Sequence, residues 1–161
     1  MTTPRPLKTN RKAGPAWLLV LLWTAVVLWA GGEEASANVT SRFIGPFLRW
    51  LLPDATPEVL NRIHFFIRKG AHLFEYGVLA LFALLALLAS TRAAALRLTL
   101  PALAWVLAVA ACDEIRQASS LARTGSAWDV VLDLAAGILG VTFALAYLRG
   151  TRVRRAALER G

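Results

Sequence analysis

Residues 67–78 read IRKGAHLFEYGV and contain four side chains that could exchange protons or bind a ligand. If this segment is helical, Lys69, His72, Glu75 and Tyr76 share an arc of about 120°, at about 100° per residue. His72 and Glu75 are three residues apart, so they could also contact one metal ion. Because the segment opens a long apolar run, its polar groups need partners or water.

Two more polar clusters follow, ACDEIRQASS at the end of one apolar run and RTGSAWDVVLDLAAG at the start of the next. On helices, each cluster again forms a single stripe, about 100° and 80° wide. Lys69, Arg116 and Arg123 could neutralise part of the acid, and the surplus would have to hold protons or a cation. The chemistry-bearing members of these clusters are Asp113, Glu114, Gln117, Ser126, Asp129 and Asp133.

The segments that carry these stripes are long and apolar. The chain has 161 residues, of which 57% are hydrophobic and 17% charged, with a mean hydropathy of +0.55. A membrane-spanning helix needs about 20 apolar residues. The sequence therefore predicts an all-α membrane bundle of four transmembrane helices, at about residues 15–31, 71–90, 93–112 and 127–148.

The first apolar segment has two readings. Arg11 and Lys12 precede it, and Ala35-Ser36-Ala37 follows it as an A-x-A-like cleavage signal. Its apolar stretch is longer than the core of a signal peptide, about 7 to 15 residues, which favours a retained anchor. Between it and the second helix, SRFIGPFLRWLL and PEVLNRIHFFIR mix aromatic residues with spaced Arg, as short amphipathic interfacial helices do.

The distribution of Lys and Arg predicts the orientation. Basic residues gather in the arm of residues 1–14, in the tail of residues 149–161, and at Arg92 and Arg97. Cytoplasmic loops carry the excess of Lys and Arg, so both termini are expected in the cytoplasm. The net charge of +8 and the pI near 11 then reflect topology and the lipid bilayer, and no nucleic acid partner is needed. All three polar clusters fall at the extracytoplasmic end of the transmembrane domain, residues 15–148.

These residues resemble the VanZ-like family of small polytopic bacterial membrane proteins. The first family motif, a basic residue followed by His and Tyr, matches Lys69, His72 and Tyr76. The second, an acidic pair and Gln followed by Arg, Ser and Asp, matches residues 113–129. The family usually has Asn where this chain has Asp133, which puts a neutral role there in doubt. The resemblance covers about residues 60–145 and implies a protein of the bacterial cytoplasmic membrane, from a family linked to resistance to the glycopeptide teicoplanin.

Three functions remain open from the sequence. The first is binding or modification of a cell-envelope component, such as a lipid-linked headgroup, in an extracytoplasmic polar pocket. The second is a metal-assisted enzyme, in which a divalent cation such as Mg²⁺ or Mn²⁺ would suit the carboxylates. The third is a structural salt-bridge lock. A carrier function is disfavoured because the cytoplasmic halves of the helices offer no polar path. Whether the protein forms a homo-oligomer is left open by the sequence.

The predicted site residues follow from these alternatives. Candidate catalytic residues are His72, Glu75, Asp113, Glu114 and Asp129. Candidate metal ligands are His72, Glu75, Asp113 and Glu114. Candidate ligand-binding residues are Lys69, His72, Tyr76, Gln117, Arg123, Ser126, Asp129 and Asp133.

Overall fold

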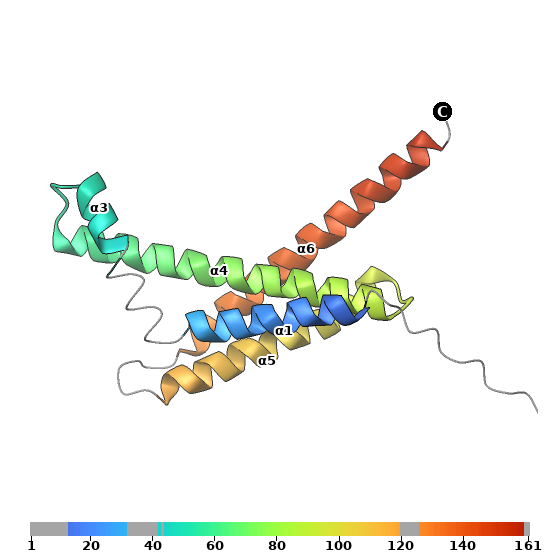
Figure 1. The fold of residues 1–161 in the computed structure, drawn as a ribbon, viewed down its shortest axis with the longest axis horizontal. Helices are drawn as coiled ribbons and strands as arrows, with labels where there is room; N and C mark the ends of the chain where they lie inside the picture. The colour runs from blue at the N-terminus through green and yellow to red at the C-terminus, as the bar shows by residue number, and fades with distance from the viewer. Residues whose placement is uncertain (1–12, 32–41, 43, 120–125, 160–161) are drawn as a thin grey trace, which may run out of the picture.

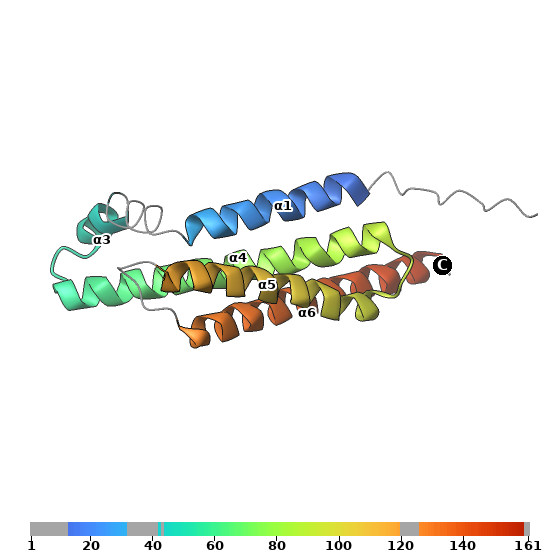
Figure 2. The ribbon, with the colours of Figure 1, turned by 90° about the horizontal axis from the view of Figure 1, so that it is seen from below.

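The four long helices run in alternating directions and pack together, except that the last part of α6 diverges from the others (Figures 1 and 2). The computed structural model describes residues 13–31, 42, 44–119 and 126–159, and of residues 152–157 only the backbone. Within them the elements are α1 (Ala13–Ala30), α3 (Gly45–Leu51), α4 (Pro57–Ser90), the 3₁₀ turn η2 (Ala95–Leu98), α5 (Thr99–Ala118) and α6 (Ala127–Leu158). Four of these segments are long and apolar enough to cross a membrane, as the sequence predicts. The beginning of α1 and the end of α6 lie toward the same end of the bundle.

The first helix is attached to its neighbours by tryptophans. Trp17 donates from its indole nitrogen to Ser90 Oγ at 2.9 Å, and Trp23 donates to the Glu75 carbonyl oxygen at 2.9 Å. Trp17 also packs edge-on against Trp105 of α5, with ring centroids 5.8 Å apart. Tryptophan combines a large apolar surface with one donor that needs a partner when it is buried. These contacts hold α1 against α4 and α5.

The second predicted interfacial segment is continuous with the second transmembrane helix. PEVLNRIHFFIR forms the first turns of α4, which runs unbroken for 34 residues. Pro57 suits the first turn of a helix, and no proline follows before Ser90 to end it. At about 1.5 Å per residue, α4 is about 51 Å long and exceeds the hydrocarbon core of about 30 Å. Its first turns, together with α3, project past the ends of α1 and α5 (Figure 1).

The third long helix lies further along the sequence than predicted. α5 begins at Thr99, after η2, and continues to Ala118, whereas the hydropathy pattern indicates residues 93–112. Pro101 explains the start, because proline fits only the first turn of a helix. At the other end, α5 continues through the polar residues Asp113, Glu114, Arg116 and Gln117, because helical spacing lets Asp113 pair with Arg116 and Gln117. The fourth helix likewise continues beyond residue 148, through Gly150, to Leu158.

Glycines set the crossing of α4 and α6. A Cβ atom added to Gly140 would collide with the backbone of Gly77, so the two helices meet there backbone to backbone. Gly137 packs against Val106 of α5, where an added Cβ would lie 3.0 Å from the valine side chain. Close approach through small residues is the usual way helices associate in membranes. These glycines therefore bring α4, α5 and α6 together just beyond their polar ends.

Candidate functional site

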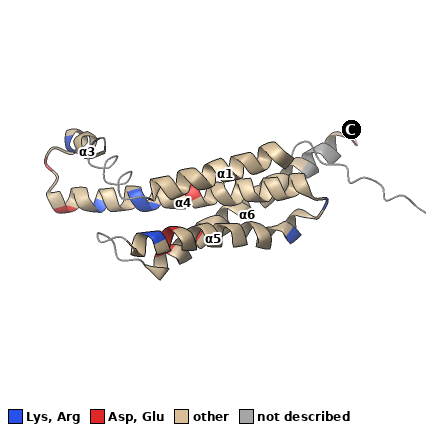
Figure 3. Ribbon diagram, turned by 60° about the horizontal axis from the view of Figure 1, so that its bottom comes forward, with Lys and Arg blue, Asp and Glu red and all other residues tan. Residues whose placement is uncertain are grey.

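The acidic residues of the bundle gather toward the end from which α3 and the first turns of α4 project (Figure 3). Described basic residues toward the opposite end include Arg92 and Arg97 of the α4–α5 connection and Arg149 of α6. The three predicted stripes thus meet on facing helices. Asp133 of α6 lies within electrostatic range of Asp113 and Glu114 of α5 and of Lys69 of α4.

An ion pair joins α4 to α6 at the mouth of this cluster. Lys69 Nζ lies 2.6 Å from Asp129 Oδ1, and the two side chains are 26% and 35% exposed. Lys69 also lies over the Phe65 ring, 5.7 Å from its centroid. The positive charge of Lys69 is therefore already compensated by protein groups, which reduces its capacity to attract an anionic ligand.

Among the described residues the best-buried carboxylate is that of Asp113 on α5, with 2% of its side chain exposed. Arg116 donates to Oδ1 at 2.6 Å, and Gln117 donates to Oδ2 at 2.7 Å. Arg116 also donates to the Leu28 carbonyl of α1. A Cβ atom on Gly31 would lie 2.5 Å from the Asp113 carboxylate, so only glycine leaves room for it. The end of α1 therefore closes one side of the site.

Glu114 connects the end of α5 to the start of α6. Its carboxylate accepts a hydrogen bond from the backbone N–H of Ser126, immediately before α6 begins. The Ser126 carbonyl in turn accepts from the backbone N–H of Asp129 at 2.8 Å. An acceptor at a helix N-terminus satisfies an N–H that lacks a partner within the helix. Glu114 and the main chain of Ser126 thus fix where the α6 stripe starts.

Three groups at the centre of the cluster have no hydrogen-bond or ion-pair partner among the described residues. They are the Tyr76 hydroxyl and the carboxyl groups of Glu75 and Asp133. Tyr76 is fully buried, and its hydroxyl has no hydrogen-bond partner among the described residues. The His72 ring is stacked near it, with centroids 6.3 Å apart and planes at 16°. Asp133 is 7% exposed, and neither its carboxylate nor that of Glu75 has a hydrogen bond or ion pair within the described part of the chain. Buried polar groups are normally paired, so this centre has unused hydrogen-bonding capacity.

A small cavity lies between the three helices at this point. Its volume is about 30 Å³, which is room for about two water molecules. Leu73 and Leu132 form an apolar part of its wall, and both are exposed on the outside of the bundle, by 43% and 44%. The polar residues that line it are Lys69, His72, Gln117, Asp129 and Asp133. The cavity therefore lies between the polar cluster and two leucines that are partly exposed on the outside of the bundle.

The structure brings most of the predicted site residues into this cluster. Arg123 lies outside the described residues, and the Ser126 contact comes from the backbone instead of the hydroxyl. Within the described ranges no three His, Cys, Asp or Glu side chains form a group that could hold a metal ion. A metal site at His72, Glu75, Asp113 and Glu114 stays a prediction.

Sequence reasoning missed the contribution of α1. Leu28 and Gly31 complete the surroundings of Asp113, although the first helix has no charged residue. The pair Gly31-Gly32 at the end of that apolar run was the one available signal, since paired glycines permit a close approach of other groups.

Comparison with known proteins agrees with this geometry. The sequence pattern of the VanZ/LLP1 family matches residues 16–148, which include all or most of each of the four candidate membrane spans and every residue of the cluster. No curated protein and no solved structure matches the chain. Since the match extends over most of the 161 residues, it confirms the resemblance carried by the two polar motifs. The chain belongs to the VanZ/LLP1 family.

Proposed function

We propose that this protein binds, and holds for modification, the polar head of a cell-envelope lipid or lipid-linked precursor. The observation that carries the proposal is the cavity at the α4–α5–α6 end, where Asp133 has a buried carboxylate with no partner among the described residues. We place this end on the outer side of the bacterial cytoplasmic membrane, with both termini inside, because of the distribution of Lys and Arg.

The size of the cavity and its unpaired carboxyl group define which chemical group can enter it. A volume of about 30 Å³ admits one small polar group and excludes a whole headgroup. Lys69 is paired with Asp129, so Asp133 is the carboxyl group of the lining that has no partner among the described residues. The group that enters is therefore a hydrogen-bond donor, such as a sugar hydroxyl or an ammonium, which donates to Asp133.

Access from the bilayer supports a lipid as the carrier of this group. Leu73 and Leu132 are exposed beside the cavity, where acyl chains would contact them. A lipid could then place its polar head in the cavity while its chains stay in hydrocarbon. His72 lines the same cavity, and an imidazole is the commonest general acid or base, which is what modification of a bound hydroxyl would require.

The test is complementation of a deletion strain with wild type, Asp133→Asn, His72→Ala or the control Asp54→Asn, on the exposed α3–α4 turn. Lipid precursors are measured by mass spectrometry, and glycopeptide susceptibility is recorded in the same strains. We expect wild type and Asp54→Asn to restore the profile, and the two cavity variants to be present in the membrane but inactive. Full activity of both cavity variants would contradict the proposal.

A structural lock is the second candidate, because the ion pair Lys69–Asp129 ties α4 to α6, and Arg116, which is paired with Asp113 on its own helix, donates to the Leu28 carbonyl of α1. The exchange Lys69→Asp with Asp129→Lys separates the two functions. A lock keeps its attraction when the charges are exchanged, so the double variant should work where each single variant fails. If the residues instead form a binding site, the exchange presents the wrong groups to the ligand. The double variant should then be stable but inactive.

A further inference from the structure

A second cavity lies outside the bundle, between α3 and the first turns of α4. It measures about 390 Å³, which is within the range of small-molecule sites, about 300–1,000 Å³. One wall is a face of α3 and the other a face of α4 with the spacing i, i+3, i+4, i+7. The residues that line it are Gly45, Pro46, Arg49, Pro57, Leu60, Asn61 and His64.

The polar groups of this cavity suit an anion. Arg49 brings a fixed positive charge, Asn61 an amide, and His64 an imidazole. The Nε2 atom of His64 is buried and has no hydrogen-bond partner among the described residues. None of the described residues that line the cavity is acidic, in contrast to the cavity of the bundle. Arginine with neutral N–H donors is a common arrangement for binding phosphate oxygens.

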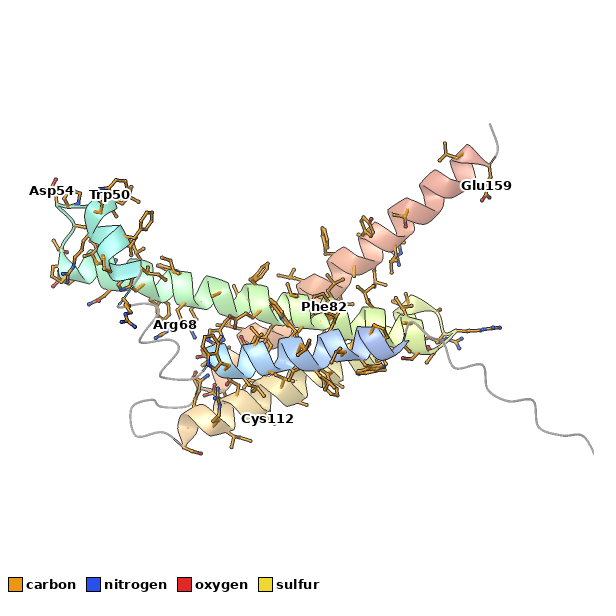
Figure 4. All side chains as sticks on the ribbon, in the orientation of Figure 1. Trp50, Asp54, Arg68, Phe82, Cys112 and Glu159 are labelled. Carbon is orange, nitrogen blue, oxygen red and sulfur yellow. The ribbon has the colours of Figure 1, made fainter. Side chains whose placement is uncertain are left out.

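The surroundings of the cavity indicate a membrane lipid as the source of the phosphate. Trp50 of α3 is 75% exposed and Phe66 of α4 is 68% exposed. Figure 4 shows Trp50 on α3 and Arg68 further along α4. Aromatic side chains with nearby basic residues are typical of helices that lie at the level of lipid headgroups. The length of α4 beyond the hydrocarbon core also places this hairpin at that level.

We propose that the α3–α4 cavity binds the phosphate group of an anionic membrane phospholipid, through Arg49, Asn61 and His64. This site is separate from the cavity at the end of the bundle and does not depend on the function proposed for it. It would hold the projecting hairpin against the membrane surface.

The experiment uses the purified full chain in neutral detergent and a short-chain phosphatidylglycerol as the probe. Binding is measured by native mass spectrometry and by the ¹H–¹⁵N signals of His64. We expect saturable binding that perturbs the His64 imidazole signals, and a loss of affinity of about tenfold for Arg49→Gln and for His64→Phe, because a hydrogen bond to a charged group is lost. The control Arg62→Gln, an exposed residue of the same hairpin outside the cavity lining, should change affinity less than about twofold.

Two results would overturn the proposal. Equal losses for Arg49→Gln and Arg62→Gln would show nonspecific attraction between basic residues and the lipid. Displacement of the lipid by an equal concentration of inorganic phosphate would show a site for the free anion instead. Circular dichroism of each variant checks that the helices are intact, and Asn61→Leu provides a further variant that leaves every charge in place.

Discussion

The acidic residues of the bundle differ in what their neighbours provide. Asp113 accepts hydrogen bonds from Arg116 and Gln117, whereas the Asp133 carboxylate has no partner in the described parts of the chain. Both are buried. A buried carboxylate with two donors is a structural element, and a buried carboxylate without donors is available to a ligand or a proton. We therefore propose a structural role for Asp113 and a binding role for Asp133.

The first prediction concerns Asp113. Asp113→Ala should lower the free energy of unfolding by about 2 kcal/mol, because Gln117 and Arg116 lose an acceptor in a buried place. Asp129→Ala should cost less than about 1 kcal/mol, since the Lys69–Asp129 pair is partly exposed. Unfolding of the purified variants in mixed micelles measures both. Equal costs would mean that burial does not distinguish these two carboxylates.

The second prediction concerns Tyr76, whose hydroxyl is buried without a partner among described residues. Tyr76→Phe should leave the free energy of unfolding unchanged or raise it by up to about 1–3 kcal/mol, because the desolvation cost of the buried hydroxyl is removed and no hydrogen bond is lost. The same variant should reduce complementation of the deletion strain if the hydroxyl contacts the ligand. A large loss of stability would show instead that the hydroxyl has a structural partner.

At the scale of the elements, two glycines at the α4–α6 crossing provide a matched pair. A Cβ on Gly140 would collide with the Gly77 backbone, whereas a Cβ on Gly77 would lie 3.5 Å from the Ala136 carbonyl oxygen, an ordinary contact. Gly140→Ala should therefore destabilise the bundle by about 1–3 kcal/mol, the usual cost of overpacking. Gly77→Ala should be neutral or slightly stabilising, because alanine favours the helix. Thermal unfolding of both variants tests this, and a stable Gly140→Ala protein would contradict the observed crossing.

The sequence was sufficient to predict the elements that have a strong pattern. Four apolar segments and three polar stripes indicated the bundle and the gathering of acids at one end, and the structure agrees. Helix ends were harder, because hydropathy shows where a helix enters lipid and the helix itself continues beyond that point. The continuous α4 and the end of α5 at Ala118 are both of this kind.

The environment of Asp113 could not be predicted for a different reason. Leu28 contributes a backbone carbonyl and Gly31 contributes the absence of a side chain, and neither leaves a pattern in hydropathy or charge. The α3–α4 cavity is similar, since it needs the angle between two helices as well as the spacing on each. A single sequence shows which polar residues share one face of a helix. It does not show which loop or backbone groups of other elements pack against that face.

For the whole molecule, the described residues at the two ends of the bundle differ in charge, and this difference predicts which side of the membrane holds the site. The α3–α4 turn and the α4–α5 connection lie at opposite ends of α4. The chain has a single cysteine, Cys112, so Cys112→Ser provides a cysteine-free background for labelling.

In that background we expect Asp54→Cys, in the α3–α4 turn, to react with a membrane-impermeant maleimide in intact spheroplasts. Arg92→Cys, in the α4–α5 connection, should react only after the membrane is permeabilised, because basic loops stay in the cytoplasm. This pattern would place both cavities at the outer leaflet, where envelope lipids are accessible. The reverse pattern would place the acidic cluster on the cytoplasmic side. It would then exclude binding of an outer-leaflet headgroup by the bundle cavity, while the phosphate site between α3 and α4 would face the inner leaflet and its anionic lipids.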